Sequence, residues 1–153
     1  MALETDVDPT LAPIESDEQK LRQVLINVLS NALKFTPAGG RVTICAQPEP
    51  GGGCRIAVED NGIGMTPENI PIALAPFGQI DSSLARKYGG AGLGLPIAKR
   101  FAVLLGGRLD IRSSAGAGTT ITITLPARAG AVVGRRSVDE PASVAELHLA
   151  KAS

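Results

Sequence analysis

The sequence predicts an α/β sandwich, an α+β fold in which a mixed, mostly antiparallel sheet carries its helices on one face. Two observations predict this class. Apolar residues recur at helical spacing in two separate segments, and two pairs of short segments alternate between apolar and polar residues. The chain has 153 residues, 44% hydrophobic and 20% charged, which suits one domain with a single core and excludes wholesale disorder and collagen-like repeats.

The first helix is expected over residues 17–34. Residues 16–19, with the sequence Ser-Asp-Glu-Gln, resemble a capping box. Pro37 and the following glycine pair, Gly39 and Gly40, end the segment. Between these limits seven apolar residues recur at 3-1-3-1 spacing: Leu21, Val24, Leu25, Val28, Leu29, Ala32 and Leu33.

Period-two alternation predicts two hairpins. The first joins strands at residues 41–46 and 55–59 across a glycine-rich turn, and the second joins strands at 108–112 and 120–125. A second helix is expected between the hairpins, over about residues 93–105, where Pro96 is tolerated because it lies in the first turn. Further strands are expected at residues 11–15 and at about residues 2–7.

The composition changes after Pro126, where Ala, Gly, Arg and Ser replace any periodic pattern. We therefore expect a domain over residues 1–126 and a flexible tail over residues 127–153, in which residues 143–151 could form a short helix. The sole histidine, His148, falls in this tail and is interpreted as a solvated residue.

The charge balance excludes several classes of partner. The chain has 15 Lys and Arg against 15 Asp and Glu, so nucleic acid and anionic membranes are not expected to bind it. It has no apolar run of about 20 residues and an acidic N-terminus, so we expect a cytoplasmic location, although a longer parent could be anchored in the inner membrane. Cys45 and Cys54 are interpreted as reduced core thiols.

The first candidate for chemistry is a stripe on the first helix. Asn27, Asn31 and Lys34 stand at i, i+4 and i+7, so they share one face. Asparagine is a poor helix former, whereas its amide offers an oxygen to a cation and N–H donors to a phosphate. The spacing alone leaves open that this is merely a solvated face.

Two glycine-rich segments are the other candidates. Asp60 ends a predicted strand just before Gly62 and Gly64, and its carboxylate could accept a hydrogen bond from an exocyclic amine, although an ordinary Asx turn explains the same residues. Residues 89–95 open the second helix and could present backbone amides to an anion, or could be a flexible linker. They match neither a Walker loop nor a dinucleotide fingerprint.

Together the motifs resemble the catalytic and ATP-binding domain of sensor histidine kinases, within the superfamily of DNA gyrase, the ninety-kilodalton heat-shock chaperones and MutL. The resemblance covers residues 17–126 and rests on five motifs in order. They are similar to the family's N box (23–37), first glycine box (60–64), F box (75–79), second glycine box (90–95) and final glycine motif (116–120). The F box departs from the family at its first position, where Leu74 replaces the usual Phe.

The resemblance implies the histidine-kinase ATPase fold with ATP and Mg²⁺ as cofactors. At the adenine end, Asp60 takes the amino group of the base and Thr119 assists through a water. The wall of the adenine site would consist of Gly62, Ile63, Gly64 and Met65.

At the phosphate end, the expected catalytic residues are Asn27, Asn31 and Lys34. The resemblance makes Asn31 the Mg²⁺ ligand, brings Asn27 to the phosphates and lays Lys34 and Phe35 along the triphosphate and ribose. The cover over the β- and γ-phosphates would be Gly90, Ala91, Gly92, Leu93, Gly94 and Leu95. A mobile lid over residues 76–89 would be anchored by Phe77 and would offer Arg86, Lys87 and Tyr88 to phosphate or base.

The resemblance also implies the reaction. Members that hydrolyse ATP carry a glutamate at the position of Asn27, and asparagine cannot accept a proton at neutral pH, so the γ-phosphate is expected to pass to a histidine. That histidine stands on an upstream helical dimerisation domain, which nothing before Asp17 provides, and a response regulator takes the phosphate onward. The alternative is a degenerate kinase domain that acts as a nucleotide-responsive interaction module.

Overall fold

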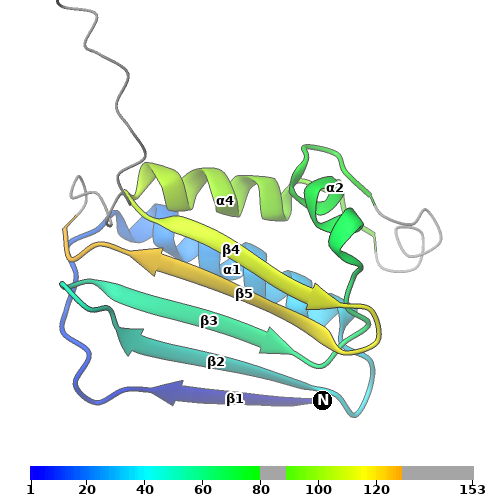
Figure 1. Ribbon diagram of the computed structural model, residues 1–153, viewed down its shortest axis with the longest axis horizontal. Helices are drawn as coiled ribbons and strands as arrows, with labels where there is room; N and C mark the ends of the chain where they lie inside the picture. The colour runs from blue at the N-terminus through cyan, green and yellow to red at the C-terminus, as the bar shows by residue number, and fades with distance from the viewer. Residues whose placement is uncertain (80–88, 129–153) are drawn as a thin grey trace, which may run out of the picture.

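One five-stranded sheet organises the computed structural model, which describes residues 1–79 and 89–128 (Figure 1). The strands stand in the order β1-β2-β3-β5-β4; β1 pairs with β2 in parallel and the other three pairs are antiparallel. Their bounds are Ala2–Val7 (β1), Arg41–Pro48 (β2), Cys54–Asp60 (β3), Arg108–Ser114 (β4) and Gly118–Leu125 (β5). The predicted mixed, mostly antiparallel sheet with its two hairpins is confirmed.

The two long helices lie on the same face of the sheet (Figure 1). They are α1 (Glu18–Phe35) and α4 (Gly94–Leu104), and both were expected from their apolar spacing. Two short helices that the sequence did not indicate, η1 (Pro67–Asn69) and α2 (Ile70–Leu74), follow β3. Each has a proline in its first turn, which fits a helix start because that position needs no N–H partner.

The core lies between the two long helices and the sheet. Val24, Val28 and Ala32 recur every four residues along α1 and are almost fully buried, as are Val58 of β3 and Ile123 of β5 beneath the helices. Burying one such aliphatic side chain stabilises the fold by about 1.5–3 kcal/mol. The apolar stripe therefore fixes which face of α1 meets the sheet, and so which face carries its polar residues.

The start of α1 differs from the predicted capping box. Asp17, not the serine before it, is the N-cap, and its side chain accepts a hydrogen bond from the backbone N–H of Lys20 at 3.0 Å. The residue three positions beyond this cap is lysine, so no glutamate or glutamine side chain returns to the cap. The helix therefore begins one residue later than the box predicts.

Residues 11–15 do not form the predicted strand. Asp8 ends β1 by accepting from the backbone N–H and hydroxyl of Thr10, which turns the chain. Of the predicted strand only Glu15 forms an isolated bridge, with Arg128. Leu11 and Ile14 instead pack against the core, so these apolar residues are buried without strand pairing. The other expected strand, over residues 2–7, is confirmed as β1.

The neighbouring positions of β3 and β5 join two distant segments. Asp60, the last residue of β3, pairs with Thr119 near the start of β5. The loop after β3 and the turn between β4 and β5 therefore meet at one end of the sheet, beneath α1 (Figure 1). The predicted tail, apart from Ala127 and Arg128, lies outside the described residues, so the domain boundary at residue 126 stays a prediction.

Candidate functional site

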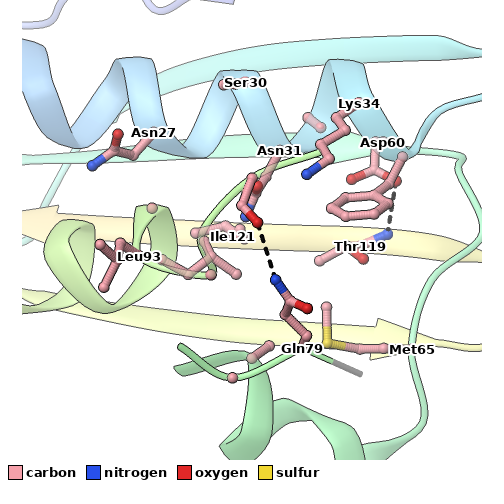
Figure 2. A pocket seen from close by; sticks show the side chains of 18 of the residues that line it. Asn27, Ser30, Asn31, Lys34, Asp60, Met65, Gln79, Leu93, Thr119 and Ile121 are labelled. Atoms are coloured by element: carbon pink, nitrogen blue, oxygen red, sulfur yellow. Dashed lines mark hydrogen bonds between the residues drawn. The ribbon is translucent and has the colours of Figure 1, made fainter. Parts of the chain in front are cut away.

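A cavity of about 330 Å³ lies between α1, the end of β3, the start of β5 and the glycine-rich segment that leads into α4 (Figure 2). It contains polar groups from segments far apart in sequence. Its walls are formed by Asn27, Ser30, Asn31, Ala32, Lys34, Phe35, Asp60, Ile63, Gly64, Met65, Ala73, Gly78, Gln79, Gly89, Gly90, Ala91, Gly92, Leu93, Gly94, Leu95, Thr119 and Ile121.

The polar stripe of α1 faces this cavity. Asn27, Asn31 and Lys34 all line it, so the alternative of a merely solvated face is wrong. Gln23 donates to Oδ1 of Asn27 at 3.0 Å, whereas the buried Nδ2 of Asn27 has no hydrogen-bond partner within the described residues. A buried donor without a partner is costly, so an acceptor brought to this N–H group would stabilise the structure.

Asp60 marks the opposite end of the cavity. Its Oδ1 accepts hydrogen bonds from the backbone N–H group of Gly62 at 2.9 Å and from that of Thr119 at 3.3 Å, the second of which Figure 2 shows. Burial raises the pKa of the Asp60 carboxyl above its ordinary value, and these two hydrogen bonds oppose that rise. Because both bonds go to Oδ1, the other carboxylate oxygen can accept from a donor on a ligand.

The backbone around Asp60 fits only if two positions are glycine. Gly64 and Gly118 have positive φ angles of 62° and 101°. A Cβ at Gly64 would collide with the carbonyl oxygen of Ser114, and one at Gly118 would collide with that of Asp60. The loop after β3 and the turn before β5 therefore pack backbone against backbone, which holds the Asp60 side chain in place.

A cationic group and the glycine-rich segment also meet in the wall of the cavity. The Lys34 ammonium donates to the carbonyl oxygen of Gly89 and lies 5.1 Å from the centre of the Phe35 ring. Gln79 donates to the carbonyl oxygen of Gly90 at 3.0 Å. The glycine-rich segment beyond them leads into the N-terminus of α4, where backbone N–H groups favour an anion.

The cavity brings together most of the predicted site residues. Gly62 does not line it, but its N–H holds the Asp60 carboxylate. Phe77 does not line it either: with a side chain 71% exposed and a φ of 60°, it is not packed as the apolar anchor that was predicted. An aromatic side chain anchors only where it is buried, so that expectation is wrong. Arg86, Lys87 and Tyr88 lie outside the described residues.

Several lining residues were not named as site residues from the sequence. Ser30 precedes Asn31, three positions after Asn27 on the same face of α1, so helical spacing could have indicated it. In the sequence, Gln79 was noted only as the last residue of the segment that resembles the F box, residues 75–79. Gly78 and Gly89 fall within the expected lid, whereas Ala32, Ala73 and Ile121 carry no polar side chain that would have singled them out.

The described residues contain no group of three or more His, Cys, Asp or Glu side chains that could hold a metal ion by themselves. Asn31 offers one amide oxygen to the cavity. This donor set fits a hard cation such as Mg²⁺, which keeps several waters and is bound mainly through a ligand's phosphates. Within the same described ranges, no helix has the length and apolar character needed to cross a membrane.

Comparison with known proteins gives a consistent result. The HATPase_c family model, described as histidine kinase-, DNA gyrase B-, and HSP90-like ATPase, matches residues 16–129. The chain is 39% identical over 142 residues to an uncharacterized sensor-like histidine kinase of Rhizobium meliloti, covering 93% of this chain and 27% of the relative. It is 42% identical over 113 residues to the histidine protein kinase DivJ of Caulobacter vibrioides, covering 74% and 19%.

Solved structures show the same similarity. Full-length ShkA in complex with AMPPNP superposes with a TM-score of 0.71 at 34% identity, over 82% of this chain and 25% of that one. The mycobacterial sensor histidine kinase MprB superposes with a TM-score of 0.68 at 30% identity, over 83% of each chain. The chain therefore spans about a quarter or less of the two sequence relatives and of ShkA, and most of the MprB structure.

Proposed function

Because the chain belongs to the family of histidine kinase-, DNA gyrase B- and HSP90-like ATPases, we propose that its cavity binds ATP with Mg²⁺ for transfer of the γ-phosphate to a histidine on a helical dimerisation domain. One observation carries this proposal. A single cavity is lined by a carboxylate with an oxygen free to accept, by the Lys34 ammonium and by Asn27, whose buried amide nitrogen has no partner within the described residues. An adenine nucleotide has the complementary arrangement, with an amino group on its base and anionic phosphates.

At the base end, Asp60 accepts from the adenine amino group, beside Ile63, Gly64 and Met65. The two backbone hydrogen bonds to Oδ1 orient the carboxylate before any ligand arrives. This preorganisation avoids the cost of ordering the side chain on binding. Thr119 lines the same end and assists through a water.

At the phosphate end, the N–H donors and the charge come from α1 and the glycine-rich segment. Asn27 and Lys34 line the same cavity as the N-terminal segment of α4, and the buried Nδ2 of Asn27 has no partner in the part of the chain that the structure describes. Asn31 would hold the Mg²⁺ through its amide oxygen, and the ion would neutralise charge on the phosphates when bound.

The position of the carboxylate that lines the cavity favours phosphotransfer over hydrolysis. Asp60 is the only carboxylate among the described residues that line the cavity, and it is held by two N–H groups at the base end. The phosphate end has amides and a lysine instead, which cannot take a proton from water at neutral pH. Attack by water should be slow, so the γ-phosphate would persist until a histidine reaches it.

The partners follow from this reaction. We expect the histidine on the helical dimerisation domain of a homodimeric kinase, and a response regulator that takes the phosphate from that histidine. Both relatives above are named histidine kinases, which supports this assignment. A cytoplasmic location suits an enzyme that uses ATP, and a longer parent could still be anchored in the inner membrane.

The test is phosphotransfer in trans. Supplied with radiolabelled ATP, Mg²⁺ and the histidine-bearing domain of the full-length kinase, the chain should form an acid-labile phosphohistidine on that domain. An acceptor domain with its histidine replaced is the control and should stay unlabelled. A folded chain that binds ATP under these conditions and never labels the acceptor would favour the interaction module instead.

A further inference from the structure

The Ser113 hydroxyl connects three parts of the base end of the cavity. Ser113 lies in β4 directly opposite Thr119 of β5. Its half-buried Oγ contacts the backbone N–H of Met65 at 2.8 Å, the carbonyl oxygen of Gly118 at 3.0 Å and the hydroxyl of Thr119 at 2.8 Å. Two of its neighbours, Met65 and Thr119, line the cavity, whereas Ser113 itself does not.

The positions of the protons follow from these three contacts. A serine hydroxyl has one proton to donate and two lone pairs that accept. The carbonyl of Gly118 can only accept, so it receives the Ser113 proton, and the N–H of Met65 can only donate, so it occupies one lone pair. The remaining lone pair of Ser113 must therefore accept the hydroxyl proton of Thr119.

This arrangement leaves Thr119 as an acceptor toward the cavity. Its backbone N–H donates to Asp60 Oδ1 and its hydroxyl proton goes to Ser113. Both donors of Thr119 are thus directed into the protein. The base end then presents the second carboxylate oxygen of Asp60 and the lone pairs of the threonine oxygen, which suit an amino group or a bridging water and disfavour a carbonyl oxygen.

We propose that Ser113 is a positioning residue for nucleotide specificity: it fixes the polarity of the Thr119 hydroxyl, so that the site selects a 6-amino purine over a 6-oxo purine. This inference rests on the proposed adenine-nucleotide site. A bridging water that donates one proton to the Thr119 oxygen can donate its second proton to the ring nitrogen next to the amino group. That nitrogen accepts in adenine, whereas in hypoxanthine it carries a hydrogen.

The test compares the affinities of ADP and IDP by titration calorimetry. Ser113→Ala releases the Thr119 proton, which can then turn to a 6-oxo group, so the ratio of IDP to ADP dissociation constants should fall by about three- to tenfold, the size of one neutral hydrogen bond. Ser113→Thr keeps a hydroxyl and should restore the ratio. Ser114→Ala, on the exposed neighbour in β4, is the matched control and should not change it.

A purely structural role would lower both affinities equally and leave the ratio unchanged, and that result overturns the proposal. Thr119→Val covers the case in which Ser113→Ala does not fold, because it removes the hydroxyl without disturbing the contacts of Ser113 to Met65 and Gly118. Thr119→Val should also lower the ratio of the IDP to the ADP dissociation constant, and an unchanged ratio would overturn the proposal. If the unaltered chain binds neither ADP nor ATP, the nucleotide site fails and not the role of Ser113 alone.

Discussion

Replacing Asp60 by asparagine tests the base end of the cavity with the smallest change of shape. An asparagine can keep its Oδ1 as the acceptor for the N–H groups of Gly62 and Thr119, because the two side chains have the same outline. The free carboxylate oxygen then becomes an NH₂ group. A donor would face the amino group of adenine, which is also a donor.

The expected loss follows from that one contact. A hydrogen bond to a charged partner contributes about 1.5–3 kcal/mol, so ADP and ATP should bind roughly 10- to 150-fold more weakly to Asp60→Asn. Titration calorimetry measures the change directly. Glu59→Gln is the matched control, since it removes an exposed carboxylate from the adjacent position of β3, and its affinity should equal that of the parent.

Asp60→Asn should weaken nucleotide binding, but it should not destabilise the fold. Burial raises the pKa of the Asp60 carboxyl above 3.8, so the folded protein binds that proton more tightly than the unfolded chain. The resulting stability is fully present below pH 3.8 and is lost as the pH rises through the raised pKa. Without ligand, Asp60→Asn should therefore unfold at a temperature equal to or above that of the parent at pH 7, and this advantage should shrink toward pH 3.8.

Calorimetry and thermal unfolding together can refute the reasoning. Equal ADP affinity for Asp60→Asn and the parent would show that the carboxylate does not recognise the base. A marked drop in unfolding temperature at pH 7 would show that its charge stabilises the fold, contrary to the effect of burial. GTP should also bind the parent far more weakly than ATP, because its 6-oxo group faces an acceptor.

Three further predictions concern the metal, the glycine-rich segment and the thiols. Asn31→Ala should abolish the gain in ATP affinity that Mg²⁺ gives and leave the affinity without metal unchanged. Calorimetry with and without Mg²⁺ measures this gain, and an undiminished gain would refute the role of Asn31 as a ligand. Gly92→Ala should weaken ADP binding about fivefold or more, because Gly92 has a φ of 70° and the added Cβ would lie 2.8 Å from the carbonyl oxygen of Gly78. Gly39→Ala is the control: Gly39 has a similar φ of 82°, but no atom lies within 4 Å of the added Cβ, so ADP affinity should not change. Burial raises the pKa of both thiols, and Cys54 is only 4% exposed whereas Cys45 is half-buried. At pH 8 a thiol reagent should therefore modify Cys45 in the folded protein and Cys54 only when the protein unfolds. Equal rates of modification in the folded protein would contradict this.

The sequence determined the parts of this protein that depend on neighbouring residues. The 3-1-3-1 apolar spacing fixed α1 and, with it, the common face of Asn27, Asn31 and Lys34. Alternation fixed the hairpin partners β2 with β3 and β4 with β5, because short turns connect them. The strand expected at residues 11–15 was wrong, since Leu11 and Ile14 are apolar because they pack on the core and not because the segment pairs with the sheet.

The tertiary structure alone decided what depends on contacts between distant segments. The pairing of β3 with β5 brings Asp60 to Thr119, 59 positions apart, and no local pattern encodes that register. The register of β4 against β5 sets Ser113 opposite Thr119, where a serine that looks ordinary in sequence receives a threonine proton. Phe77 matched a motif and yet is exposed, because burial depends on what surrounds a side chain. Spacing along the chain thus determined which groups share a face, and packing between elements determined which of their donors and acceptors remain for a ligand.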